Sequence, residues 1–519
     1  MGNHKKATTA YSRAPAGLEA PLVRVEVHLS NGLPGFALVG LPEAVVRESK
    51  ERVRVALLTA GYEFPQRRIT VNLAPADLPK EGGRFDLPIA VAILAADRKI
   101  DSRALERREF YGELSLGGEL RETRKLLPSL IAGANLGNEM ILPAANALEA
   151  SLLPGAKLCL LSRLDEVVAT LRGKTNGPAG FVQGGLPSSS KVSHPQLSPK
   201  SMPDLADVRG QYAAKRALEI AAAGEHGLLM IGPPGAGKTL LAQRLPGLLP
   251  PLSESEILEV ASVESAAGRR PSAGGRRPFR SPQHTASMAA LIGGGALRPG
   301  ELSLAHLGVL FLDELPEFPR NALEALREPL ETGSVVVTRL KHTCEFPAKF
   351  QLVAAMNPCP CGYAGDPRGR CHCTAEQILR YRNRLSGPLI DRIDIHVELA
   401  GLPVEHLMND MRMNDMRSGA ESTAEVAMRV AAARSLQLKR QGKLNARLTP
   451  AEVATLCGLD KESRTLLGTA MARLGLSARA YHRVLKIART CADLSGEPEI
   501  RPIDVAEAVK LRALDRPTC

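Results

Sequence analysis

The sequence predicts an α/β protein in which a parallel sheet is flanked by helices. Three apolar, β-prone runs predict the sheet: residues 227–231, 307–312 and 350–356, each of which ends at polar or glycine-rich residues. A helical pattern at 240–245 follows the first run. The chain has 519 residues, which is too long for one hydrophobic core. About two to four domains are therefore expected.

The pattern divides the chain into folded parts and connecting segments. In the first part β-rich runs alternate with helical ones, and a stretch rich in Gly, Pro and Ser then indicates a linker. The last part is helical, with Asp504 as the expected N-cap of the final helix. The expected segments are 1–173, an α+β domain with strands at 22–29 and 69–73 and helices at 43–60 and 88–96; 174–203, a flexible linker; 204–400, an αβ core; 401–421, a loop with a Met-Asn-Asp-Met-Arg tandem at 408–417; and 422–519, a helical lid.

Composition limits the location and the partners of the protein. No apolar run approaches a membrane span, and the basic N-terminus lacks the apolar segment of a secretory signal. Nine cysteines in such a chain indicate reduced thiols in the cytoplasm. Lys and Arg outnumber Asp and Glu by 67 to 55, which favours a nucleic-acid partner, with mere solubility as the alternative. With no Trp and 3% aromatic residues, contact with the nucleic-acid backbone is favoured over base stacking.

Residues 230–239 carry the clearest chemical signal. They read Met-Ile-Gly-Pro-Pro-Gly-Ala-Gly-Lys-Thr and match the phosphate-binding pattern G-x-x-x-x-G-K-[ST] between a strand and a helix. Glycines let successive backbone N–H groups face phosphate oxygens, and the helix N-terminus adds its positive dipole end. Lys238 is expected to reach the β- and γ-phosphates, and Thr239 to hold Mg²⁺. The residues predicted to bind ATP are Gly232, Pro233, Pro234, Gly235, Ala236, Gly237, Lys238 and Thr239.

Two later strands end in groups that ATP hydrolysis uses. The run at 307–312 is followed by Asp313, expected to hold Mg²⁺ through water, and by Glu314, expected to polarise the attacking water. An isolated Asp-Glu pair is often only a helix cap, but downstream of a phosphate loop it favours catalysis. The run at 350–356 ends at Asn357, which is placed to sense the γ-phosphate or the water.

Residues 386–394, Ser-Gly-Pro-Leu-Ile-Asp-Arg-Ile-Asp, resemble AAA+ ATPases, specifically the branch with the magnesium chelatase motor subunit and the minichromosome maintenance helicases. The resemblance implies that Arg392 is an arginine finger, which reaches into a neighbouring subunit's ATP site and stabilises transition-state charge. It also implies that Arg479, within the Leu-Ser-Ala-Arg-Ala of 476–480, is the second sensor on the helical lid. The alternative for both arginines is a surface salt bridge.

Two basic segments interrupt the predicted core. One is the arginine- and glycine-rich stretch 269–280, and the other, 335–346, reads as a β-hairpin. In the resembling branch these positions line the central pore of a ring, and such arginines suit a phosphate backbone. The alternatives are a solvated loop or a contact with a neighbour's nucleotide. The expected DNA contacts are Arg276, Arg277, Arg280, Arg339 and Lys341.

Four cysteines follow Asn357 closely. They form C-x-C, nine residues, C-x-C, and four thiols can hold tetrahedral Zn²⁺, with His372 able to replace one of them. The two-residue gap of zinc knuckles is absent, and the alternative is a set of free cytosolic thiols. The expected zinc ligands are Cys359, Cys361, Cys371 and Cys373.

The first domain resembles the proteolytic domain of Lon around residues 79–86, Pro-Lys-Glu-Gly-Gly-Arg-Phe-Asp. Lon-type peptidases have their nucleophilic serine where this chain has Arg84, which cannot attack a carbonyl. Peptidase activity is therefore not expected, and such a fold would serve oligomerisation or DNA binding.

Longer motifs extend the resemblance over residues 11–516. Gly-Leu-Pro-Glu at 40–43, Val-Asn-Leu-Ala-Pro-Ala-Asp-Leu at 71–78, Arg-Ser-Pro-Gln-His at 280–284 and the cysteine quartet look like the ComM/YifB family. This resemblance implies a hexameric, ATP-driven DNA motor that promotes branch migration during natural transformation. Two alternatives are a chelatase-type motor subunit that remodels a protein partner, and a protease or protein-unfolding chaperone.

Overall fold

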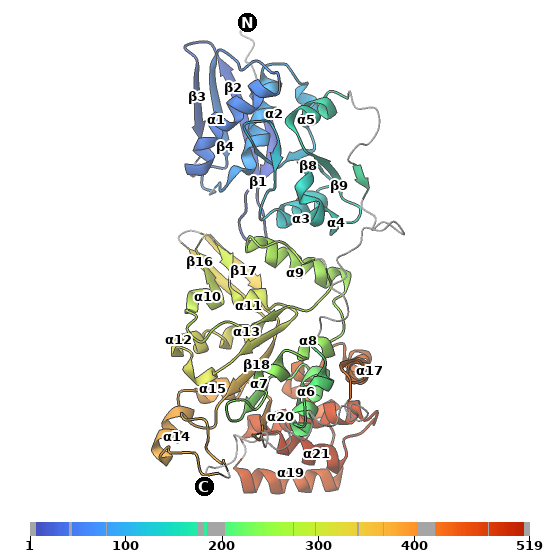
Figure 1. Ribbon diagram of the computed structural model, residues 1–519. Helices are drawn as coiled ribbons and strands as arrows, with labels where there is room; N and C mark the ends of the chain where they lie inside the picture. The colour runs from blue at the N-terminus through green and yellow to red at the C-terminus, as the bar shows by residue number, and fades with distance from the viewer. Residues whose placement is uncertain are drawn as a thin grey trace, which may run out of the picture.

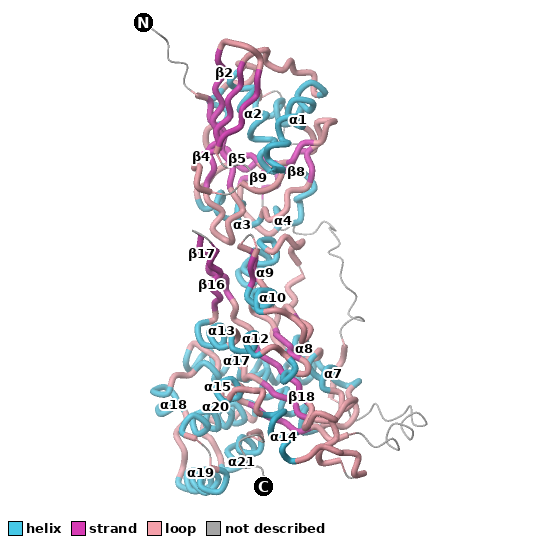
Figure 2. Tube along the Cα trace, turned by 90° about the vertical axis from the view of Figure 1, so that its left-hand side faces the viewer, coloured by secondary structure: helices cyan, strands magenta, loops and turns pink. Residues whose placement is uncertain are grey.

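The protein is described by a computed structural model in which three folded parts stack into a column (Figures 1 and 2). We call them the front domain, the core and the lid, and the α/β fold class predicted from the sequence is confirmed. The 408–417 tandem and most of the predicted linker lie outside the described residues. The described residues are 7–40, 44–78, 80–173, 181–183, 203–272, 274–295, 297–339, 342–366, 368–401, 421–475 and 477–512.

The front domain is built on an eight-stranded sheet in the order β10-β9-β8-β5-β1-β2-β4-β3. Its predicted strands and helices are confirmed within two residues at each boundary, and α2 is buried on every side because the sheet and neighbouring helices enclose it. The strands are β1 Thr8–Arg13, β2 Leu22–Ser30, β3 Gly35–Val39, β4 Arg68–Ala74, β5 Arg108–Phe110, β6 Glu113–Leu114, β7 Leu120–Arg121, β8 Glu139–Pro143, β9 Lys157–Leu161 and β10 Phe181–Gln183. The helices are α1 Ala44–Thr59, α2 Asp86–Ala96, α3 Leu127–Asn135, α4 Ala147–Ser151 and α5 Leu164–Leu171.

The core holds a five-stranded, all-parallel sheet in the order β12-β15-β18-β11-β19. Its three middle strands are buried along their whole length, as expected for parallel strands with helices on both faces. The strands are β11 Leu228–Ile231, β12 Phe279–Arg280, β13 Gly293–Gly294, β14 Arg298–Pro299, β15 Val309–Leu312, β16 Ser334–Arg339, β17 His342–Pro347, β18 Gln351–Met356 and β19 Ile395–Glu398. The helices are α6 Tyr212–Gly224, α7 Lys238–Ala242, α8 Leu245–Leu248, α9 Glu254–Ala266, α10 Met288–Ile292, α11 Glu301–Leu304, α12 Arg320–Glu324, α13 Arg327–Thr332, α14 Ala375–Arg382 and α15 Gly387–Ile390.

Two local predictions in the core need adjustment. The single helix expected at 240–245 is two short helices, α7 and α8, because Pro246 has no N–H to donate to the preceding turn. The predicted hairpin at 335–346 is confirmed, with β16 and β17 paired antiparallel.

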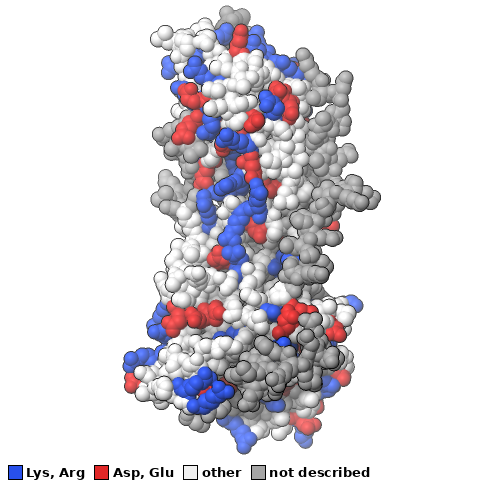
Figure 3. Space-filling model, in the orientation of Figure 1, with Lys and Arg blue, Asp and Glu red and all other residues white. Residues whose placement is uncertain are grey.

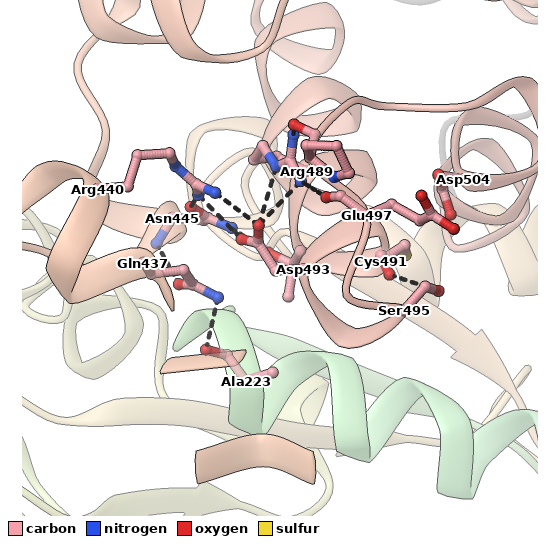
Figure 4. Close-up of polar contacts among 12 residues, drawn as sticks. Ala223, Gln437, Arg440, Asn445, Arg489, Cys491, Asp493, Ser495, Glu497 and Asp504 are labelled. Atoms are coloured by element: carbon pink, nitrogen blue, oxygen red, sulfur yellow. Dashed lines mark hydrogen bonds and ion pairs between the residues drawn. The ribbon is translucent and has the colours of Figure 1, made fainter. Parts of the chain in front are cut away.

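The lid is helical and is tied to the core by hydrogen bonds from long side chains. Arg434 and Gln437 donate to the carbonyls of Ala222 and Ala223 at 2.8 and 3.2 Å, which caps the C-terminal end of α6. Figure 4 shows Asp493 as the centre of the lid's own network, where it accepts from Arg440 at 2.7 Å. The lid helices are α17 Thr423–Gln441, α18 Pro450–Leu456, α19 Lys461–Leu474, α20 Ala478–Leu494 and α21 Pro502–Lys510.

The prediction that Asp504 is the N-cap of the last helix is wrong. The N-cap of α21 is Arg501, and Asp504 is the third helical residue, whose carboxylate accepts from the backbone N–H of Arg501 at 2.9 Å. The carboxylate still satisfies a free N–H at the helix start, but it reaches back from inside the helix.

Front domain and core meet where α3 and α4 approach α9. The hydroxyl of Ser265 accepts from the N–H of Leu127 at 3.2 Å and donates to Glu149 at 2.8 Å. Burial raises the pKa of Glu149 above its usual value, and the hydrogen bond from Ser265 opposes that rise. None of the helices that the structure describes has the length and apolar character needed to cross a bilayer.

Candidate nucleotide site

The phosphate-binding loop lies where β11 ends and α7 begins. Gly235 and Gly237 have φ angles of 76° and 89°, a conformation that side-chain-bearing residues rarely adopt. The helix starts at Lys238, so its first N–H groups face the loop. The predicted strand, loop and helix are therefore arranged as phosphate binding requires.

Lys238 is buried beneath this loop and points along it. Its Nζ donates to the carbonyls of Gly232 at 2.5 Å and Pro233 at 3.1 Å, and to the side-chain oxygen of Asn357 at 2.9 Å. Burial lowers its pKa, while Asp313 and Glu314 oppose this shift. The ammonium thus lies at the carboxyl ends of β11 and β18, where the sequence predicts nucleotide binding.

Thr239 and Asp313 face each other across the loop. The Thr239 hydroxyl donates to a carboxylate oxygen of Asp313 at 2.8 Å. Asp313 directly follows β15, and a hydroxyl beside a carboxylate is a pair that Mg²⁺ accepts, usually together with water and phosphate oxygens. These two side chains fit a magnesium ion bound with ATP.

Glu314 has a histidine partner that the sequence did not reveal. Its carboxylate lies 3.2 Å from Nδ1 of His284, and about half of each side chain is exposed. His284 follows β12, which pairs in parallel with β15, so the neighbouring strand brings it to Glu314. The position of His284 in the sequence, close to the basic segment 269–280, does not indicate this contact with Glu314. The contact depends on which strands pair.

Both arginines expected to act on ATP pair with acidic side chains. Arg392 donates to the Pro388 carbonyl at 2.7 Å and pairs with Glu331. Arg479 lies 3.5 Å from Asp391, with most of its side chain exposed. Among the residues that the structure describes, neither arginine forms a hydrogen bond or ion pair with the phosphate-binding loop.

The five residues expected to contact DNA have different environments. Arg276 is exposed, whereas Arg277 is mostly buried and donates to the carbonyls of Pro250 at 2.7 Å and Leu307 at 2.8 Å. Burial lowers the pKa of Arg277. Arg280 is paired with Glu301, at 2.6 and 2.8 Å, but is still partly exposed. The side chain of Arg339 and all of Lys341 lie outside the described residues.

The four cysteines expected to bind zinc come together. Their sulfurs all lie within 4.8 Å of one another, and His372 is not part of the group. Cys359 is buried and the other three are partly exposed. Backbone hydrogen bonds, the strongest from Tyr363, lower the pKa of Cys361 to about 6.

Arg84, in the place of a Lon-type serine, is a buried structural residue. Its guanidinium donates to the carbonyls of Arg124 at 2.6 Å and Lys125 at 3.1 Å, and to the hydroxyl of Ser129 at 3.3 Å. Burial lowers its pKa to about 10. The guanidinium also donates to the carbonyl of Arg13 at 3.4 Å, so Arg84 joins its own loop to the end of β1 and to residues 124–129.

Comparison with known proteins gives the family. The family models for magnesium chelatase subunit ChlI match residues 204–407, those for subunit ChlI of Mg-chelatase residues 25–146, and those for the ChlI C-terminal part residues 420–512. The competence protein ComM of Haemophilus influenzae is 48% identical, over 98% of this chain and 97% of that protein. A YifB protein of Salmonella typhimurium is 47% identical over the same shares, and a protein of Mycobacterium tuberculosis is 41% identical over 97% of this chain and 98% of its own length. The chain therefore belongs to the ComM/YifB family of magnesium-chelatase-like AAA+ proteins.

Proposed function

We propose that this protein is an ATPase that works as a motor on DNA. The assembly of Lys238, Thr239, Asp313, Glu314 and Asn357 carries the proposal. Three separate chain segments, which follow β11, β15 and β18, supply the kinds of group that ATP hydrolysis needs. In that assembly Lys238 and the loop hold the phosphates, and Thr239 and Asp313 hold Mg²⁺. Glu314 polarises the attacking water, and Asn357 orients it.

The active form in this proposal is a ring, a hexamer as in the family resemblance. Arg392 is the finger for a neighbouring subunit's ATP, and Arg479 is the sensor on the lid. Support comes from Arg392, which in the described part of one chain pairs with Glu331 and forms no hydrogen bond or ion pair with that chain's own phosphate-binding loop. Such contacts suit a finger that acts on the ATP of a neighbouring subunit. An arginine finger of this kind is typically worth about 10³- to 10⁵-fold in rate.

DNA, single-stranded and branched, is the proposed partner. The net charge of +12 and the basic segments of the core support it. On the face in Figure 3, Lys and Arg side chains gather along the middle of the column, interspersed with acidic ones. At the boundary of the front domain and the core, a cavity of about 440 Å³ is lined by Arg124, Lys125, Arg269 and Arg270 and also by the acidic Glu122 and Glu149. Through the ComM relationship, the proposed task is branch migration while incoming strands are integrated, in the cytoplasm.

The proposed cofactors are ATP and Mg²⁺, with a structural Zn²⁺ at the cysteine group. The donor sets fit these ions: hydroxyl and carboxylate oxygens for Mg²⁺ and thiol sulfurs for Zn²⁺.

A second candidate is a chelatase-like or chaperone-type ATPase that remodels a protein. The match of the ChlI models to all three parts of the chain favours it. The nucleotide site does not separate the two candidates, because both would use it.

The test is to measure ATP turnover of the full-length protein without DNA, with single-stranded DNA and with a three-stranded junction, and to score strand exchange in parallel. Lys238→Ala is the control for contaminating ATPases and should be inactive in every arm. Turnover that rises with DNA, together with movement of the junction, is the expected result. A rate of ATP turnover that no DNA changes would overturn the motor proposal and leave the protein-remodelling candidate.

A further inference from the structure

The segment between β18 and α14 is an irregular loop that has almost no apolar core. Residues 357–366 and 368–374 form no helix or strand, and among them only Cys359 and Gly362 are buried. Loops of this length without their own structure are uncommon inside compact domains. Something other than apolar packing must therefore hold the loop in one shape.

The positions of the cysteine sulfurs suit a metal ion, which could hold the loop in one shape. Sγ of Cys359 lies 3.3 Å from that of Cys361 and 3.7 Å from that of Cys371, and Cys361 and Cys371 are 3.6 Å apart. A tetrahedral Zn²⁺ with bonds of about 2.3 Å places its sulfurs about 3.8 Å apart. A disulfide requires about 2.05 Å. The N–H of Ala364 also donates to Sγ of Cys359 at 3.2 Å, a contact that orients the sulfur as outer-shell groups do in metal sites.

The part of this loop that follows β18 packs against the phosphate-binding loop. Gly362 has a φ of 86°, and a Cβ added there would lie 2.7 Å from Cδ of Pro234 and 3.8 Å from Cγ of Asn357. Gly362 follows Cys361 directly. A shift of the Cys361 sulfur therefore moves the backbone that packs on both nucleotide-site residues.

The part of the loop that precedes α14 is connected to Asn357 as well. Thr374 caps α14, its hydroxyl accepting from the N–H of Gln377 at 3.3 Å. Farther along this helix Tyr381 is buried beside the backbone of Asn357; burial raises its tyrosine pKa to about 12, and a hydrogen bond from Asn357 opposes that rise. Asn357 is thus held from both ends of the segment that the four cysteines close.

We propose that Cys359, Cys361, Cys371 and Cys373 bind one Zn²⁺ ion, which braces the nucleotide site by fixing Pro234 and Asn357. The kinetic part rests on the proposed ATPase function, whereas the metal site does not. Zinc here takes no part in the reaction. It replaces the missing apolar core of the loop and holds Asn357 where it meets Lys238.

The first measurement is metal content of the full-length protein, with Cys371→Ser, Cys371→His and His372→Ala as variants. Wild type should hold about one zinc per chain, as four-thiol sites do. Cys371→Ser should lose it, Cys371→His should keep it because imidazole is also a zinc ligand, and the neighbouring His372→Ala should keep it as the matched control. Iron in place of zinc, or metal-free wild-type protein with its full ATPase, would overturn the assignment.

The brace is tested on basal ATP turnover without DNA, in excess Mg²⁺, with a chelator selective for Zn²⁺. Removal of zinc should lower turnover by about 10-fold or more, in the range of changes around metal sites, and added Zn²⁺ should restore it. Hydrogen exchange should rise within 357–382 while the remaining core stays protected. A zinc-free Cys371→Ser variant with wild-type turnover and exchange would refute the brace. Wild-type protein that holds zinc but hydrolyses no ATP would instead refute the proposed function alone.

Discussion

The phosphate-binding loop of the core and the Arg84 loop of the front domain are built alike and have different uses. Each has a glycine with positive φ, Gly237 at 89° and Gly82 at 71°, followed closely by a cation and the start of a helix. Each cation is buried and donates to backbone carbonyls. The resemblance of the two loops in their local pattern therefore does not fix their chemistry.

The difference lies in what surrounds each cation. Lys238 borders the exposed Thr239 and the strand ends that carry Asp313 and Asn357, so the loop opens onto ionisable and polar groups. Arg84 is 4% exposed, and the adjoining Gly83 has no room for a side chain because a Cβ would lie 2.5 Å from Glu113. A loop open to solvent at the carboxyl ends of parallel strands can receive a ligand, whereas a sealed one can only stabilise the fold.

Among the variants that test this contrast between the open and the sealed loop, Arg392→Ala should have the largest effect. If the open site is completed by a neighbouring subunit, this variant should bind ATP normally and lose about 10³- to 10⁵-fold in turnover. Mixed rings with Lys238→Ala subunits should regain part of the rate, since some interfaces then combine an intact loop with an intact finger. Turnover should be measured against mixing ratio. A flat, inactive curve would count against a finger that acts between subunits.

The next largest effect is expected at Glu314. Glu314→Gln should keep ATP binding and lower turnover by about 10²- to 10⁴-fold, because the amide cannot take a proton from the attacking water. Turnover and binding of a fluorescent nucleotide should be measured together. His284→Ala, which removes the partner at 3.2 Å, is the companion variant and should change the rate far less. Wild-type turnover in Glu314→Gln would move the water-polarising role to another carboxylate.

In the sealed loop, replacement should affect stability and leave the nucleotide chemistry alone. Arg84→Ala leaves the carbonyls of Arg124 and Lys125 without their buried donor and also empties a buried volume, so it should lower the free energy of unfolding by about 2–5 kcal/mol. Thermal unfolding should be compared with that of Arg124→Ala, whose side chain is exposed. Arg84→Ser should cleave no casein. An Arg84→Ala protein of unchanged stability, or peptidase activity in Arg84→Ser, would undo the contrast between the loops.

The smallest effect is expected in the basic segment of the core. Arg276→Ala should weaken DNA binding and lower the salt dependence by about one unit of slope, because an exposed phosphate contact is lost. Arg277→Ala should instead cost about 1–3 kcal/mol of stability, since two partly buried carbonyls lose their donor. DNA affinity at several salt concentrations and thermal unfolding separate the two. Equal effects of both variants on DNA binding would place Arg277 in the DNA path after all.

Much of the candidate site was predictable because its parts follow local rules. The strands before Gly232, Asp313 and Asn357 are continuous apolar runs, and the carboxyl ends of parallel strands share one edge of a sheet. The cysteine group was predictable from spacing, since both C-x-C pairs lie within one loop. The contact between His284 and Glu314 was not, because it depends on which strand lies next to β15.

The sequence by itself determined the elements of this protein: its buried strands, its glycine turn, its cysteine spacing and the arginine at position 84. These follow from backbone sterics and the periodicity of apolar residues, which act over a few residues. Only the tertiary structure decided which charges are exposed. Arg276 and Arg277 are neighbours in one basic run, yet Arg276 is exposed and Arg277 donates to the partly buried carbonyls of Pro250 and Leu307, because burial depends on segments distant in sequence.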